Sequence, residues 1–162
     1  MTSIEQKAWN ILSEVEDPEI PVISILDLGI VRSIQEIDGM LQVQITPTYS
    51  GCPATQVIEE SVIEAIKKAE IGPFEVKTVL SPSWSTTMIS ESGKQKLLDY
   101  GIAPPADEST DKLALMGEPR QIKCPNCGST NTKMVSQFGS TPCKSHFKCK
   151  ECLEPFDYFK CL

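Results

Sequence analysis

The chain has 162 residues, of which 40% are hydrophobic and 23% charged, and its formal net charge is −7. This length fits one or at most two domains, and the composition is that of a folded globular protein rather than a disordered or fibrous one. No apolar run approaches the roughly 20 residues that a membrane-spanning helix needs, and the first residues lack a secretory signal pattern. We therefore expect a soluble, cytoplasmic protein without a membrane partner.

Charge and cysteine are divided unevenly along the chain. Residues 1–120 hold 9 Lys or Arg against 19 Asp or Glu, a net of −10, whereas residues 121–162 hold 6 against 3, a net of +3. Six of the seven cysteines also lie beyond residue 120. Residues 104–120 are rich in proline and acid, a composition typical of extended linkers. We therefore expect a domain over residues 1–103, a linker over 104–120 and a cysteine-rich module over 121–162.

Apolar spacing predicts the elements of the first domain. In chain order these are a helix over 3–15, strands over 29–37 and 41–46 joined by an Asp-Gly hairpin turn, a helix over 53–70, a strand over 74–80, and a helix around 86–100. The order α-β-β-α-β-α predicts an α+β fold, in which a small mixed β-sheet is covered by helices.

Cys52 is the one cysteine of the first domain, and it falls where the helix over 53–70 should begin. A thiol at a helix N-terminus faces unpaired N–H groups that favour its reactive thiolate form. Thr48 and other hydroxyl side chains of the preceding loop are available as its partners. The residues alone leave two interpretations open, a thiol that binds metal or acts as a nucleophile, and a small buried residue without a function.

Asp17 and Glu19 are carboxylates of a loop that contains two prolines. They could ligate iron, but solvated loop charges or helix caps are the commoner roles of such residues. The first domain contains no histidine, which excludes a Ser–His or Cys–His nucleophilic pair within it.

The last module contains the motif C-x2-C-x21-C-x2-C, formed by Cys124, Cys127, Cys149 and Cys152. Two such pairs place four thiolates around one structural Zn²⁺. About 40 residues cannot bury enough surface to fold unaided, so the metal should hold the module together. Alternating apolar residues near 133–138, 144–148 and 156–159 predict short antiparallel strands, and hence a zinc ribbon.

Three further interpretations of this module remain open. A disulfide scaffold suits a secreted chain, an iron–sulfur cluster also takes four thiolates, and zinc ribbons with interleaved lysines and aromatics often bind nucleic acid. The overall acidity argues against nucleic acid. Cys143, His146 and Cys161 stand outside the motif, as additional ligands, as thiols near a partner, or as small residues packed in the ribbon.

Several motifs taken together resemble one known family. Those of the first domain are Asp17-Pro18-Glu19-Ile20-Pro21-Val22, Asp27-Leu28-Gly29-Ile30-Val31 and Gly51-Cys52-Pro53. They are similar to the metal–sulfur cluster assembly family that includes SufT-like proteins. Further motifs, which narrow the resemblance to the PaaD-like subgroup, are Ser81-Pro82-Ser83-Trp84-Ser85-Thr86, Tyr100-Gly101-Ile102-Ala103-Pro104-Pro105 and Glu154-Pro155-Phe156-Asp157-Tyr158-Phe159-Lys160-Cys161.

The resemblance implies an accessory subunit of the multicomponent phenylacetyl-CoA epoxidase of aerobic phenylacetate degradation, rather than an enzyme in its own right. Such a subunit would help assemble iron or iron–sulfur clusters in the oxygenase or reductase components, with help from iron–sulfur assembly proteins. The family cysteine falls on Cys52, which would contact iron or a cluster in transit, and the acidic loop falls on Asp17 and Glu19. A homodimer is compatible with the sequence.

The sequence leaves two other functions open. Cys52 could be the nucleophile of a thiol-redox or sulfur-transfer enzyme, which predicts turnover that is lost in Cys52→Ser. The ribbon could belong to a nucleic-acid-binding regulator, which predicts salt-dependent binding to DNA or RNA that does not depend on Cys52.

Overall fold

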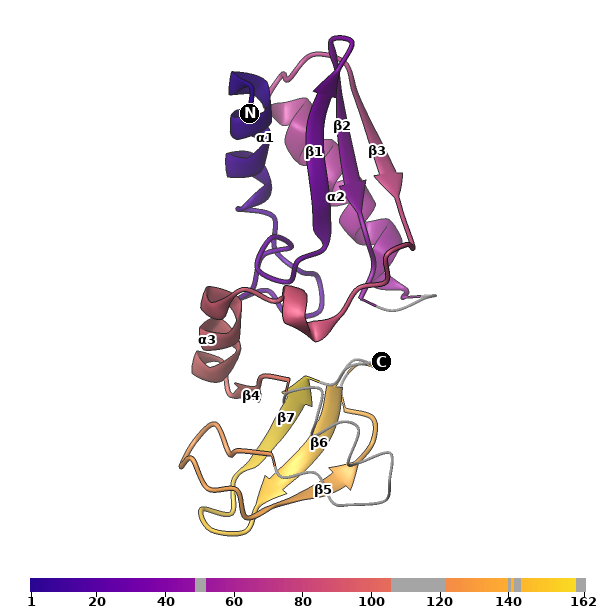
Figure 1. The fold of residues 1–162 in the computed structure, drawn as a ribbon. Coiled ribbons are helices and arrows are strands. Elements are labelled where there is room, and N and C mark those ends of the chain that lie inside the picture. Colours follow the sequence, from indigo (N-terminus) through magenta and orange to yellow (C-terminus); the bar gives the residue numbers. More distant parts are fainter. Residues whose placement is uncertain (49–51, 106–121, 140, 142–143, 160–162) are drawn as a thin grey trace. The chain divides into compact units, whose positions relative to one another are not determined.

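The computed structural model describes residues 1–48, 52–105, 122–139, 141 and 144–159 (Figure 1). Contacts along the chain separate two compact units, Met1–Gly93 and Lys94–Leu162, each with a β-sheet of its own. Among the described residues, no helix combines the length and the apolar character needed to cross a bilayer.

The first unit is built on a three-stranded sheet with the strand order β1-β2-β3. β1 (Val31–Ile37) and β2 (Met40–Ile45) form an antiparallel hairpin closed by a two-residue Asp-Gly turn. Both turn residues have positive φ, the conformation for which Asp-Gly is favoured. β3 (Phe74–Thr78) pairs in parallel with β2 after the chain has passed through α2 (Ala54–Lys68). The predicted small mixed sheet is confirmed.

The helices cover one face of this sheet. Along β2, the buried side chains Leu41, Val43 and Ile45 alternate with less buried neighbours, as expected for a strand with one covered face. α1 (Ser3–Leu12) contacts β1, α2 contacts β3, and the two helices contact each other. They therefore form one layer over the apolar face (Figure 1).

α1 ends three residues before the predicted limit at residue 15. At its start, Thr2 and Glu5 form a capping box, in which each side chain accepts the backbone N–H of the other residue. At its end, the N–H groups of Glu14 and Val15 donate to carbonyls three residues back instead of four. The apolar spacing continues through this tighter turn. For this reason the helix predicted from that spacing extends beyond the end of the α-helix.

Residues 13–30 form a loop that contributes to the core. Its fully buried aliphatic side chains are Ile20, Ile23, Ile25, Leu28 and Ile30. The N–H of Asp17 donates to the carbonyl of Ile23, and the N–H of Ile25 donates to that of Val15. The prolines predict the loop, whereas its burial has no periodic signal in the sequence.

The segment after β3 is hydrogen-bonded to this loop. The helix predicted around 86–100 is present, but its start was predicted too early. A short 3-10 turn, η1 (Thr86–Met88), is followed by an extended residue, and only then does α3 (Glu91–Asp99) begin. The Ser90 N–H donates to the carbonyl of Asp27, and the Ser90 hydroxyl accepts the N–H of Gly93. Ser90 thus starts a new helix, because its side chain takes up an N–H that the helix leaves unpaired.

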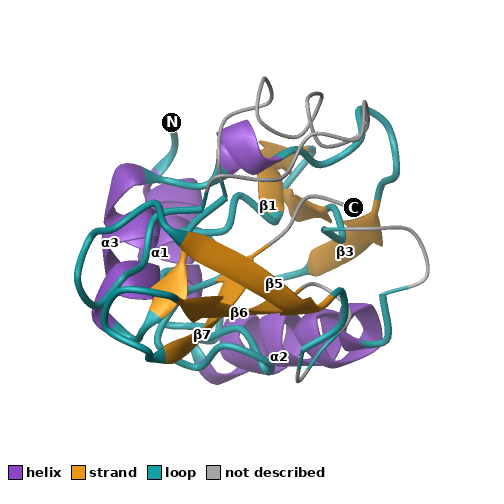
Figure 2. Ribbon diagram, turned by 90° about the horizontal axis from the view of Figure 1, so that it is seen from below, coloured by secondary structure: helices purple, strands orange, loops and turns teal. Residues whose placement is uncertain are grey.

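The second unit has a four-stranded sheet with the order β4-β7-β6-β5. Its strands are β4 (Ile102–Ala103), β5 (Thr132–Ser136), β6 (Lys144–Cys149) and β7 (Pro155–Phe159). The three longer strands lie side by side and antiparallel, close to their predicted ranges (Figures 1 and 2). Phe147 packs against Phe156 and Tyr158, with ring centroids 5.8 and 5.6 Å apart.

One strand was not expected from the sequence, and another is shorter than expected. β4 pairs in parallel with β7 through two buried residues, so residues 102 and 103 belong to the second sheet, whereas the sequence placed a domain boundary after residue 103. β3 ends at Thr78 rather than at residue 80, and Leu80 is exposed. A two-residue strand carries no period that a sequence pattern could reveal.

Candidate metal centre and cysteine loop

Four cysteines of the second unit bring their thiols together. The Sγ atoms of Cys124, Cys127, Cys149 and Cys152 all lie within 4.8 Å of one another. Those of Cys124 and Cys152 are 3.8 Å apart, and those of Cys127 and Cys149 are 3.5 Å apart. With zinc–sulfur bonds of about 2.3 Å, the sulfur atoms of a tetrahedral site lie about 3.8 Å from one another. The spacing therefore fits a tetrahedral metal ion.

The two cysteine pairs are held by turns of the same construction. The N–H of Cys124 donates to the carbonyl of Ser129 at 2.8 Å, and the N–H of Cys149 donates to the carbonyl of Glu154 at 3.0 Å. In each turn the donor is the first cysteine and the acceptor lies five residues ahead. The backbone therefore presents each pair of thiols in the same way.

The neighbouring thiols strongly affect one another's ionisation. The side-chain amide of Asn126, together with the backbone N–H of Glu154, lowers the pKa of Cys152 to about 6. At Cys127 the backbone N–H of Ser129 lowers the pKa, but the thiol of Cys149, loss of solvation and the other two thiols outweigh it and raise the pKa to about 11. One thiolate thus opposes the ionisation of another, and a bound metal cation would remove that opposition. Four sulfur donors in a tetrahedron suit zinc or iron.

Cys52 lies directly before Pro53, the N-cap residue of α2. It is half-buried, and its carbonyl accepts the N–H of Thr55 at 3.2 Å. The structure thus places this cysteine at the beginning of the helix, within one residue of the predicted position. Residues 49–51, immediately before it, lie outside the described part of the chain.

The acidic loop has a structural task. Asp17 is buried, and its Oδ1 accepts the backbone N–H groups of Glu19 and Ile20, both at 2.9 Å. These hydrogen bonds close a turn within the loop, where no described helix begins, so Asp17 is neither the helix cap nor the solvated charge that the sequence suggested. Within the described ranges, the four ribbon thiols are the one group of three or more potential metal ligands, and Asp17, Glu19 and Cys52 form no second group.

Two threonines stand at the start of the cysteine loop. Thr48 is half-buried. Thr46, at the end of β2, is buried, and its Oγ1 is the one buried side-chain polar atom of the described residues that has no hydrogen-bond partner. Such atoms are rare in native proteins. Sequence patterns give no sign of this burial.

Of the three additional candidate ligands in the ribbon, the structure describes one. His146 lies on β6, and its Nδ1 is 3.4 Å from Oδ1 of Asp157 on β7. It is not part of the four-thiol group. Cys143 and Cys161 lie outside the described residues.

Both halves of the chain match known families. Residues 5–80 match the family described as iron–sulfur cluster assembly protein, and residues 108–160 match the PaaD zinc beta ribbon domain. The four-thiol group lies within the second match, and Cys52 lies within the first.

Individual relatives agree with this division. A protein of Escherichia coli, provisionally named as a subunit of 1,2-phenylacetyl-CoA epoxidase, is 42% identical over 95% of this chain and 91% of its own length. An Fe-S protein maturation auxiliary factor of Porphyromonas gingivalis is 32% identical over 57% of this chain and 90% of its own. The crystal structure of a DUF59 domain from Bacillus anthracis superposes with a TM-score of 0.54 at 28% identity, covering 59% of this chain and 92% of that domain.

Proposed function

Because the chain belongs to the PaaD family, in which an iron–sulfur cluster assembly domain is followed by a zinc β-ribbon, we propose that it is an accessory subunit of a phenylacetyl-CoA epoxidase. Its task is to assist the assembly of iron or iron–sulfur clusters in the oxygenase or reductase subunits. The observation that carries the proposal is the match to the Escherichia coli epoxidase protein across both domains. The role in assembly is inferred from the Fe-S protein maturation auxiliary factors, which match only part of the chain.

In this proposal Cys52 is the residue that contacts iron or a cluster in transit. It stands at the start of α2, where backbone N–H groups without helical partners can face an anionic ligand. The loop that leads to it begins at Thr46, whose buried hydroxyl has no partner among the described residues. A single thiol without a histidine base suits transient binding better than turnover.

The ribbon has a structural part in the proposal. Cys124, Cys127, Cys149 and Cys152 would hold one Zn²⁺, which fixes the two cysteine turns and gives the small sheet its folding free energy. Zinc has no redox chemistry of its own. The ribbon would therefore serve to dock a partner while the first unit handles iron.

The experiment is co-expression of the oxygenase and reductase subunits with the wild-type chain, with Cys52→Ser, or without the chain. We expect iron content and epoxidase activity to fall in the last two cases. Gln56→Ala, an exposed change in the first turn of α2, is the matched control and should behave as wild type. Full metal loading and activity without the chain would refute the maturation role.

A further inference from the structure

A groove on the ribbon is lined by apolar side chains that are unusually exposed. It has a volume of about 490 Å³ and is lined by Lys133, Met134, Val135, Lys148, Cys149, Lys150 and Leu153. Met134, Val135 and Leu153 are 48%, 58% and 64% exposed. Large apolar side chains that are gathered at the surface and rimmed by polar groups mark an interaction site.

The groove lies along β5, an edge strand with a bulge. β5 stands at the end of the sheet order, and its register with β6 shifts between Met134 and Ser136. In a regular strand, Met134 and Val135 would point to opposite faces. Bulges at sheet edges re-aim side chains, and here both neighbours line the same groove.

Leu153 occupies a position whose backbone favours glycine. It follows the second cysteine of its turn and has φ of 65°, and Gly128, at the same place in the other turn, has φ of 78°. The two turns share the same hydrogen bond from their first cysteine, so the positions are equivalent. A leucine in this conformation is strained, and its exposed side chain gains little from burial within the chain. A contact with another molecule would offset this strain.

The rim of the groove carries concentrated positive charge. Lys133 and Lys148 are direct partners across β5 and β6, and like charges placed opposite each other destabilise a sheet. Lys150 adds a third ammonium group. Within the described ranges, no ion pair joins these three lysines to a carboxylate. An anionic partner would remove this repulsion.

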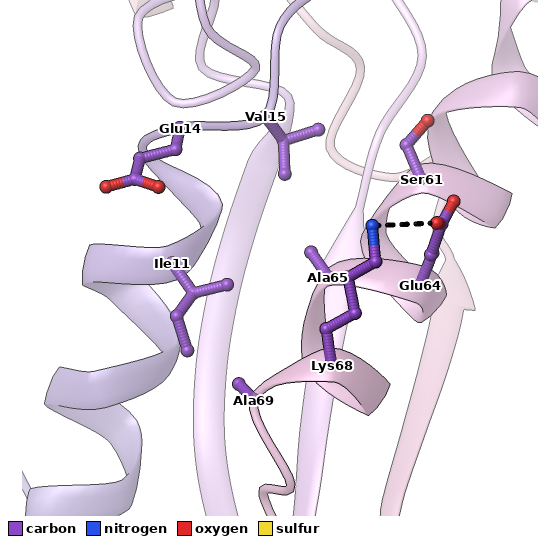
Figure 3. A pocket seen from close by; sticks show the side chains of 8 residues that line it. All are labelled: Ile11, Glu14, Val15, Ser61, Glu64, Ala65, Lys68 and Ala69. Atoms are coloured by element: carbon purple, nitrogen blue, oxygen red, sulfur yellow. Dashed lines mark ion pairs between the residues drawn. The ribbon is translucent and has the colours of Figure 1, made fainter.

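The groove between α1 and α2 in the first unit lacks this combination. It is lined by Glu14, Glu64 and Lys68 around Ile11 and Val15, and its lysine is paired with Glu64 at 3.1 Å (Figure 3). Its charges are mixed and partly satisfied. The ribbon groove therefore makes the stronger case for a charged partner.

We propose that the ribbon groove docks an extended segment of a partner protein, in which aliphatic side chains alternate with carboxylates. The aliphatic groups would contact Met134, Val135 and Leu153, and the carboxylates would pair with the lysines. The inference rests on the proposed accessory role, which it deepens by naming the docking surface. A nucleic acid fits less well, because none of the described residues that line the groove is aromatic and could stack on its bases.

The test uses the full metal-loaded chain and a fluorescein-labelled peptide of sequence Glu-Val-Asp-Leu-Glu-Val-Asp. One control peptide replaces its aliphatic residues with serine, another replaces its acids with lysine, and a short oligothymidylate stands for nucleic acid. We expect the first peptide alone to bind, with an affinity that falls with salt, as measured by fluorescence anisotropy.

Two groove variants should weaken this binding about tenfold or more. Leu153→Gly removes an apolar contact, and the double variant Lys133→Glu with Lys148→Glu reverses the charge at the rim of the groove. Leu153→Gly relieves strain, so a folding defect should not confuse its result. The matched controls are Leu80→Gly, a leucine of the first unit that is 62% exposed, and Lys67→Glu on α2. Neither should change binding.

The proposal is overturned if the wild-type chain does not bind the peptide, if the serine peptide binds equally well, if Leu153→Gly binds as wild type, or if oligothymidylate binds more tightly. Peptide binding is measured without any epoxidase subunit. Its failure therefore leaves the metal-loading experiment on Cys52 unaffected, and the two proposals can fail separately.

Discussion

The Ser92 hydroxyl donates to Oδ1 of Asp27 at 2.7 Å, across 65 residues of sequence. The Ser90 hydroxyl donates to the same oxygen at 2.8 Å, and that of Ser24 donates to Oδ2 at 3.2 Å. One carboxylate thus joins the buried loop over residues 13–30 to the start of α3. The sequence marked Asp27 as part of a family motif, and its three hydroxyl contacts give that motif a structural role.

Asp27→Asn should destabilise the first unit by about 2 kcal/mol, because hydrogen bonds to a charged acceptor are stronger than those to an amide. The free energy of unfolding in urea measures this loss. Glu60→Gln, an exposed change on α2, should stay within about 0.5 kcal/mol of wild type. Equal stabilities of the two variants would show that the Asp27 contacts contribute nothing.

Gly29 offers a second test of the same junction. It has φ of 71°, and a Cβ there would lie 2.5 Å from the carbonyl oxygen of Met88. Gly29→Ala should therefore cost about 3 kcal/mol, the sum of backbone strain and a clash with backbone. At Gly39 φ is 77°, but no atom of the described part of the chain lies within 4 Å of such a Cβ. Gly39→Ala should cost only about 1 kcal/mol in the same unfolding measurement, and a reversed order would contradict this account.

The local elements of the fold could be predicted from the sequence, but the contacts between residues far apart in the chain could not. The hairpin, α2 and the three ribbon strands follow from period and turn chemistry over a few residues. The four-thiol site follows from cysteine spacing because each pair sits in one short turn. The break at Ser90 and the strand at Ile102 depend on partners more than 50 residues away, Asp27 and Asp157. The exposure of Leu153 could not be predicted either. Its backbone has a left-handed conformation, which no periodic pattern in the sequence indicates.

The pH dependence of stability should include a contribution from Glu5. The backbone N–H of Glu36 in β1, followed by that of Thr2, lowers the pKa of this carboxyl below its ordinary value of 4.5. A lowered pKa in the folded state means that the stabilisation is present above the unfolded value and is lost as pH falls through the folded value. Wild type should therefore lose more stability than Glu5→Gln between pH 7 and roughly pH 3. Parallel urea midpoints across that range would contradict the assignment.

Metal removal should unfold the ribbon and spare the first unit. Cys149→Ser removes a buried thiol of the four-thiol group, so we expect the variant to purify without bound zinc and the ribbon to become sensitive to protease, while the first unit stays folded. Zinc content by mass spectrometry and the size of the protected fragment measure both effects. Cys52→Ser is the matched control, because it removes a thiol outside the cluster and should retain a full equivalent of zinc. A ribbon that resists protease without metal would refute the structural role of zinc.

The equivalent positions Gly128 and Leu153 should respond to substitution in opposite directions. Among the described residues, a Cβ at Gly128 meets only the Lys123 side chain, at 3.5 Å, so Gly128→Ala should cost about 1 kcal/mol through backbone strain alone. Leu153→Gly should instead be neutral or stabilise the ribbon by up to about 1 kcal/mol, since it removes the same strain and little buried surface. Thermal unfolding of the zinc-loaded variants measures both. A clear loss of stability in Leu153→Gly would mean that the leucine supports the ribbon itself, and its use as a docking contact would lose its main argument.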